Sequence, residues 1–134
     1  MRNVGVVMAT AAIVTLATSP TAWASWETNA STVWSDGNMS REWSDEEYNE
    51  IKFKDCGTVT TKEIEVERWQ LVTWGLDTLR DDFTFTNCFN GTDAVSADTQ
   101  SNLPAATYYF QTDTTCASCV VSVRKIVVDT TQAD

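Results

Sequence analysis

The chain has 134 residues, with 19 acidic and 9 basic side chains and a formal net charge of −10 at pH 7. Such a surface repels nucleic acid and anionic lipid, so we expect neither a nucleic acid nor a membrane as partner. The sequence contains no histidine. This removes Ser-His-Asp and Cys-His catalysis in their usual forms, together with a common zinc ligand.

Residues 1–24 have the pattern of a secretory signal peptide. A single cation precedes an apolar run, and the sequence AWA at positions 22–24 supplies a small-x-small cleavage site. The apolar run is shorter than the ~20 residues that a membrane-spanning helix requires. We therefore expect a secreted, extracellular product that consists of one domain over residues 25–134.

The first residues after the expected cleavage site are predicted to form a loose N-terminal arm at 25–29. Chain termini are often poorly ordered, and an exposed tryptophan there is a plausible anchor for a partner. Core packing of the same tryptophan is an equally good interpretation. The candidate partner-binding residues are Ser25, Trp26, Glu27, Thr28 and Asn29.

The next segment predicts a hairpin, because the turn dipeptide Asp36-Gly37 separates residues 31–34 from residues 39–43. Residues 44–50 are compatible with a short helical turn that Ser44 would cap. Of the tryptophans, we expect Trp43 and Trp69 to fill the core.

From residue 50 onward, apolar and polar side chains alternate with a period of two, which is typical of strands with one buried side. The strands are predicted within residues 50–56, 62–68, 81–89, 107–111 and 120–129. In the last strand the apolar set changes parity near Arg124-Lys125, which indicates a bulge or a crossing between sheets.

Residues 74–82 and 90–106 are predicted to be loops, the second a long polar connection. Together these elements predict an all-β fold, a small antiparallel β-sandwich of about seven strands, immunoglobulin-like or jelly-roll-like. Two disulfides are expected to stabilise it.

Four cysteines follow the expected cleavage site, and export favours their oxidation. Cys116 and Cys119 lie between two predicted strands, so we expect a hairpin tip closed by its own short disulfide. This leaves Cys56 to pair with Cys88. A redox pair would instead open a helix, whose N-terminus lowers the thiolate pKa.

No catalytic constellation is evident, so we expect a protein that is not an enzyme. The acidic run Asp45, Glu46, Glu47 and Glu50 offers carboxylates for glycoside hydrolysis, but nothing specifies a pair on opposite sides of a sugar. We interpret the run as a solvated face. No metal site and no cofactor are predicted.

An alternative function is that of a secreted protease inhibitor, which would use the loop at residues 91–107 with Leu103 as its specificity residue. Small, disulfide-linked β domains are rigid frames for such loops. This loop carries no cysteine or other brace, however, and an unordered loop loses affinity on binding.

Three features are shared with a group of short exported actinomycete proteins. They are the tail RKIVVDTTQAD at 124–134, the strand YYFQ at 108–111, and the pair Cys56 and Cys88. The chain resembles this group over most of residues 48–134. In that group the hairpin tip lacks cysteines, so Cys116 and Cys119 would be an additional crosslink.

Proteins of this size and type resemble the small adaptor subunit of actinomycete umbrella toxin particles. The resemblance implies a β-sandwich that links a lectin-bearing, protease-like subunit to the repeat stalk of a large toxin protein. It also implies that the arm at 25–29 would be held in the protease-like cleft. The expected function is therefore a non-enzymatic, secreted protein-binding module.

Overall fold

The computed structural model describes residues 25–28, 30–58 and 61–131. The expected signal peptide and Asn29 of the expected arm lie outside these residues. The elements of the described part are β1 (Trp26–Glu27), β2 (Thr32–Ser35), β3 (Trp43–Thr58), β4 (Ile64–Gln70), β5 (Thr78–Phe85), the short 3-10 helix η1 (Asn87–Phe89), β6 (Val95–Asp113) and β7 (Val120–Asp129).

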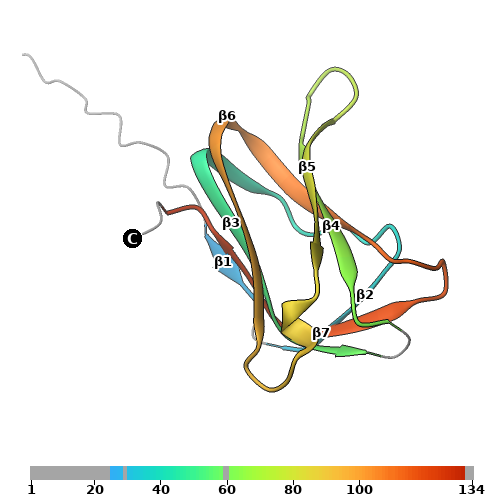
Figure 1. Ribbon diagram of the computed structural model, residues 1–134. Coiled ribbons are helices and arrows are strands. Elements are labelled where there is room, and N and C mark those ends of the chain that lie inside the picture. Colours follow the sequence, from blue (N-terminus) through green and yellow to red (C-terminus); the bar gives the residue numbers. More distant parts are fainter. Residues whose placement is uncertain (1–24, 29, 59–60, 132–134) are drawn as a thin grey trace, which may run out of the picture.

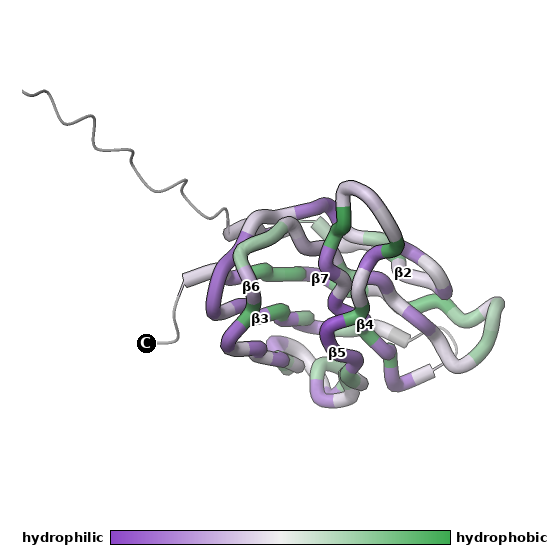
Figure 2. Tube along the Cα trace, turned by 90° about the horizontal axis from the view of Figure 1, so that it is seen from above, coloured by the Kyte–Doolittle hydropathy of each residue, from purple (hydrophilic) through white to green (hydrophobic). Residues whose placement is uncertain are grey.

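The seven strands form one antiparallel sheet with the order β1-β7-β3-β6-β4-β5, and β2 also pairs with β7. The sheet bends so that its strands surround a common interior (Figure 1). Hydrophobic and hydrophilic residues alternate along the strands (Figure 2), as the period of two requires. The predicted fold, an all-β antiparallel β-sandwich with about seven strands, is confirmed.

The core is centred on aromatic side chains from several strands. Phe110 of β6 lies 5.2 Å from Trp34, 5.5 Å from Phe53 and 6.4 Å from Trp43, measured between ring centroids. Such rings bury a large apolar area each, and their tilted contacts add to that stabilisation. Trp43 is buried as predicted, and Trp69 is half-buried against the core.

Residues 44–50 do not form the expected helical turn, because they belong to β3. Their backbone pairs with β6, and the register shifts on both sides of Glu47, which has a positive φ of 73°. A bulge of this kind bends a strand without ending it. The helical interpretation was wrong because the sequence does not show that β6 lies alongside.

The predicted polar connection at 90–106 is also mostly strand, since β6 begins at Val95. Its small residues pair with β3, for example Thr99 with Glu50 and Ala97 with Lys52. Most of these side chains are exposed, so the apolar alternation that reveals a strand is missing.

The turns at 36–37 and 114–119 connect strands that do not pair with each other. After β2, the backbone of residues 37–40 hydrogen-bonds to β6, whereas β2 itself pairs with β7. Likewise β6 pairs with β3 and β4, whereas β7 pairs with β1, β2 and β3. The predicted turns are present, but both hairpin interpretations were wrong, because the segments on the two sides of each turn pair with other strands and not with each other.

The parity change in β7 occurs at Arg124, where the pairing with β3 leaves out Asp55 and Arg124. The first half of β7 pairs with β2 and the second half with β1, and both halves pair with β3 in unchanged register. Opposite Arg124, Asp55 of β3 has a positive φ of 56°, and its carboxylate lies 2.8 Å from the guanidinium. Both halves of β7 belong to the same sheet and keep one register with β3, so neither the predicted crossing between sheets nor a bulge that shifts the register explains the change; it coincides with the positive φ of Asp55.

Both predicted disulfides are present, Cys56–Cys88 and Cys116–Cys119. Cys88 lies in η1 rather than in a strand, so the longer bridge ties β3 to the segment between β5 and β6. Cys116 is exposed in the β6–β7 turn, whereas Cys119 is buried.

Candidate functional site

The loop that joins β4 to β5, residues 71–77, projects beyond the sheet (Figure 1). Here it is called the β4–β5 loop. Trp74 and Leu76 in this loop are each 93% exposed, the largest exposed fractions among the large apolar side chains of the described residues. This tryptophan and this leucine therefore have no role in the core and are open to solvent on one loop.

The base of the β4–β5 loop is held by hydrogen bonds to the sheet. The Leu71 amide donates to the Thr107 carbonyl at 2.8 Å. The carboxylate of Asp77 accepts from the Val72 amide and from the Tyr109 hydroxyl, each at 2.9 Å. Burial and this bond to Asp77 raise the pKa of Tyr109 to about 12, so the hydroxyl stays a donor at neutral pH. The loop is therefore anchored on both sides before any partner binds.

Below the loop lies a carboxylate-rich face formed by β4, β5 and β6. Glu65 and Glu67 alternate with buried residues of β4 and so lie on the side of the sheet away from the core. They stand opposite further acids in the register, Glu67 opposite Asp82 and Glu65 opposite Asp113. Burial and the neighbouring carboxylates raise the pKa of Glu65. These four residues are called the acidic outer face.

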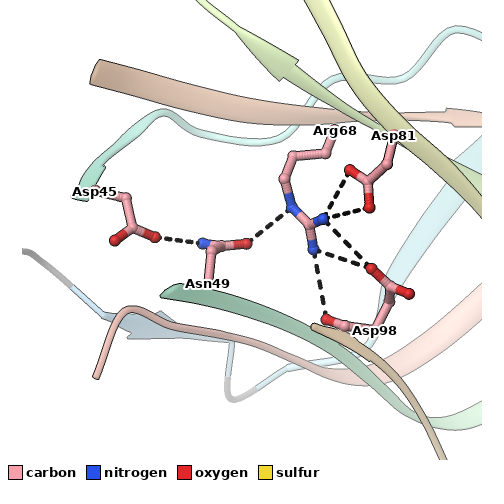
Figure 3. Close-up of polar contacts among 5 residues, drawn as sticks. All are labelled: Asp45, Asn49, Arg68, Asp81 and Asp98. Carbon is pink, nitrogen blue, oxygen red and sulfur yellow. Dashed lines mark hydrogen bonds and ion pairs between the residues drawn. The ribbon is translucent and has the colours of Figure 1, made fainter. Parts of the chain in front are cut away.

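On the other side of β4, the fully buried Arg68 organises a polar network (Figure 3). Its guanidinium donates to the Asp81 carboxylate at 2.6 and 2.7 Å and to Asp98 at 3.3 Å. Its Nε donates to Asn49 at 2.9 Å, and Asn49 in turn donates to Asp45 at 2.8 Å.

This network joins four strands, β3, β4, β5 and β6, at the place where the β4–β5 loop leaves the sheet. Burial raises the pKa of Asp45 and of Asp98, the latter in spite of the nearby Arg68. The guanidinium pairs with both flanking carboxylates, those of Asp81 and Asp98, which fits a role in holding the strands together.

The expected N-terminal arm is not loose within the described residues. Trp26 and Glu27 form β1, which pairs with Val127 and Val128 of β7. Trp26 is only 9% exposed and packs against Trp43, with ring centroids 6.3 Å apart. The interpretation of Trp26 as an exposed anchor was therefore wrong, because strand pairing at the sheet edge turns its ring inward.

The other candidate residues of this segment lie on the surface or at its margin. Ser25 and Glu27 are exposed, and Thr28 is half-buried with its hydroxyl accepting from the Ile126 amide. Asn29 lies outside the described residues. Partner binding by residues 25–29 stays a prediction, now with Trp26 as part of the core.

The proposed inhibitory loop at 91–107 is not arranged as a loop. From Val95 onward it is strand β6, and Leu103 is buried, so this side chain is not presented as a specificity residue. The acidic run that could have served a glycosidase is also divided. Asp45 is buried in the Arg68 network, whereas Glu46 and Glu47 are exposed and Glu50 pairs with Lys52 at 2.5 Å.

Within the described ranges, no three carboxylates or cysteines are grouped so as to hold a metal ion. In that same part of the chain, no helix has the length and apolar character needed to cross a bilayer.

Comparisons with known proteins add little to this description. No protein-family model matches the chain, and no curated protein does. Among solved structures, the chain is similar to an exo-beta-1,3-galactanase from Phanerochaete chrysosporium determined with galactose. The two are 14% identical, with a TM-score of 0.35, over 83% of this chain and 30% of the galactanase. This chain thus spans less than a third of that protein's length.

The predicted loop at residues 74–82 is a loop only as far as Asp77, because β5 begins at Thr78, and the sequence pattern indicates no function for it. The available signal was the run Trp74-Gly75-Leu76, two large apolar residues in a stretch that the turn-forming residues Gly75 and Asp77 predict to be a loop. No helix or strand buries such residues unless the loop folds back onto the sheet, and the sequence alone does not show whether it does.

Proposed function

We propose that this chain is a non-enzymatic, exported protein-binding module whose contact surface includes the β4–β5 loop. The exposure of Trp74 and Leu76 at 93% each on an anchored loop carries the proposal. Tryptophan is enriched at the centres of protein interfaces, where truncating one such residue often costs more than 2 kcal/mol of binding energy. An anchored loop loses little conformational entropy when it binds, which favours affinity.

The resemblance to the small adaptor subunits of umbrella toxin particles gives the proposal a more specific form. An adaptor needs two separate contact regions. Here the β4–β5 loop would be one, and the surface around the exposed residues Ser25 and Glu27 would be the other. These regions lie at opposite ends of the strand order, since β1 is the first strand and β5 the last.

A pair of photo-crosslinking variants tests the proposal. A benzophenone side chain is placed at Thr73 in the β4–β5 loop or, as a matched control, at the equally exposed Thr92 before β6. The protein is then irradiated in its native culture supernatant. We expect a protein adduct from position 73 that disappears when Trp74→Ala is added, and none from position 92.

The two contrary results have different consequences. No adduct from either position, with no larger species in the native supernatant, would contradict a protein-binding role. An adduct from position 92 alone would agree with a protein-binding role but would place the contact on another face. For the adaptor form, Glu27→Gln leaves Trp26 in the core and is expected to weaken one partner without affecting the other.

A further inference from the structure

The acidic outer face and the β4–β5 loop form one continuous surface with an apolar end and an acidic end. Trp69 connects the two, because its indole Nε1 donates to the Glu67 carboxylate at 3.0 Å and its backbone pairs with Leu79. Leu79 is 43% exposed. The surface is therefore apolar near the loop, where it contains Trp74, Leu76 and Leu79, and becomes rich in carboxylates further along β4 and β5.

The acidic end is unfavourable in the isolated protein. Like charges placed directly opposite on neighbouring strands are destabilising. Two such pairs occur here, Glu67 with Asp82 and Glu65 with Asp113. The carboxyl group of Asp36 lies close enough to Asp113 to raise its pKa through a hydrogen bond.

No cation of the described residues neutralises these four carboxylates. The ion pairs of this part of the chain involve other acids. Arg80, which lies on the adjacent β5, directs its guanidinium to the Gln70 side chain instead, with Nε at 2.8 Å. The acids thus remain available to cations from outside the chain.

The edge of the surface is also open to a further strand. In the described part of the chain β5 pairs only with β4, so its other edge presents backbone groups without a strand partner. An extended peptide can add to such an edge through main-chain hydrogen bonds, while its side chains give specificity.

From these observations we infer that the free edge of β5, the acidic outer face and the β4–β5 loop together receive an extended, lysine- or arginine-rich segment of a partner protein. The segment adds to β5 as a further strand. Its basic side chains lie over Glu65, Glu67 and Asp82, and an apolar side chain contacts Trp74 and Leu76. This inference rests on the proposed protein-binding function and names the chemistry of the partner at the same surface.

Charge favours this occupant over a second copy of the chain. A copy would bring a net charge of −10 toward another −10 and would place acids against acids. A basic segment would instead relieve the cross-strand repulsion that the free protein contains. Its binding would depend steeply on salt, because surface charges are screened over ~10 Å at 0.1 M ionic strength.

The test uses two labelled synthetic peptides of the same length with the purified residues 25–134. In one peptide lysine alternates with valine and a leucine stands at one end, and in the other glutamate replaces each lysine. Binding is measured by fluorescence anisotropy at low and at high salt. We expect binding of the lysine peptide alone, weakened at high salt.

Three variants locate the site. Glu67→Gln removes one facing charge and is expected to weaken binding of the lysine peptide by about fivefold. Trp74→Ala is expected to weaken the same binding by about thirtyfold. Glu46→Gln on β3 removes the same charge at an exposed position outside this surface, and it should leave the affinity unchanged. Far-ultraviolet circular dichroism confirms that each variant keeps its strands.

Equal affinity for both peptides, binding of neither, or an equal loss with Glu67→Gln and Glu46→Gln would each overturn the inference. Sedimentation of the protein alone as a dimer that Trp74→Ala dissociates would also overturn it, in favour of a second copy. None of these results would contradict the proposed function if the photo-crosslink at position 73 still forms. The function itself would be refuted only if neither position 73 nor position 92 gave an adduct and the native supernatant held no larger species.

Discussion

Trp26 and Trp74 occupy similar contexts in the sequence but opposite environments in the molecule. Both are flanked by small or polar residues, and neither lies in a segment that the sequence predicts to be a strand. Trp26 is 9% exposed, and its ring lies 6.3 Å from that of Phe110, whereas Trp74 is 93% exposed on the β4–β5 loop. Only the first has a strand partner, because β1 pairs with β7.

The difference shows that strand pairing, rather than distance from a chain end, decides which aromatic side chain is available to a partner. Two residues of pairing with β7 are enough to turn Trp26 inward. The β4–β5 loop is anchored as well, but its hydrogen bonds hold the base and leave the tip outside the core. A rigid base below an exposed apolar tip is the arrangement expected of a contact loop.

The largest expected effect is the loss of stability in Trp26→Ala, which is compared with Trp74→Ala. Trp26→Ala should lower the free energy of unfolding by about 4 kcal/mol, because it removes a large buried ring. Trp74→Ala should change it by less than about 0.5 kcal/mol, because the ring is in solvent. Urea unfolding of both variants measures the contrast. Similar losses in the two variants would mean that the tip of the loop packs against the sheet.

The two disulfides should also contribute unequally to the free energy of unfolding. In the chain-entropy picture, Cys56–Cys88 contributes about 3.5 kcal/mol and Cys116–Cys119 about 2 kcal/mol, because the first closes the longer loop. Replacing each pair with serine and comparing urea midpoints tests this order. A larger loss from the short bridge would show that the β6–β7 turn is more important for stability than its place in the fold indicates.

Arg68 should be the main link between the core and the β4–β5 region. Arg68→Met removes the donors to Asp81 and Asp98 and leaves those carboxylates partly buried without a cation. We expect a loss of about 3 kcal/mol, near the lower end of the range for breaking a buried ion pair, since both aspartates are partly exposed. Hydrogen exchange of β4 and β5 should also become faster than that of β7. An equal acceleration in all strands would contradict the linking role.

The smallest expected effect is a rise in stability under mild acid. Burial raises the pKa of Asp45 and of Asp98 above the ordinary value of 3.8. Such carboxyls bind protons more readily in the folded than in the unfolded chain, so stability increases as the pH falls through their folded-state pKa values. The lowered pKa of Asp129 acts in the opposite direction, and its contribution is lost only below 3.8.

The urea midpoint should therefore rise as the pH is lowered from 7 toward the ordinary aspartate value of 3.8. The measurement is made at high salt, which screens the general repulsion of a chain with net charge −10. Asp98→Asn should reduce the rise, because the amide does not titrate. A midpoint that stays level or falls over this range would show that these aspartates are ionised without cost in the folded protein.

Much of the fold could be predicted where one side of a strand is buried. The alternation in residues 62–68 and 120–129 identified β4 and β7, and the cysteine spacing gave both disulfides. The prediction failed at β6, whose first half consists of small exposed residues. It also failed at residues 44–50, where the bulge at Glu47 depends on pairing with a distant strand.

The candidate site was less predictable than the fold. The acids of β4 were visible as the outward side of an alternating strand, but their opposition to Asp82 and Asp113 depends on register with two other strands. The Arg68 network draws residues from four strands. Arg68 itself lies at an inward position of β4, where an alternating pattern predicts an apolar residue. Non-local pairing, which a single sequence does not reveal, assembled both features.

The most direct test of this account is a hydrogen-exchange map of the protein in its native complex, compared with the protein alone. The account predicts slower exchange in residues 71–85, which contain the β4–β5 loop and β5, when the partner is bound. Protection confined to residues 25–28, with exchange in 71–85 unchanged, would place the contact at β1 and contradict it.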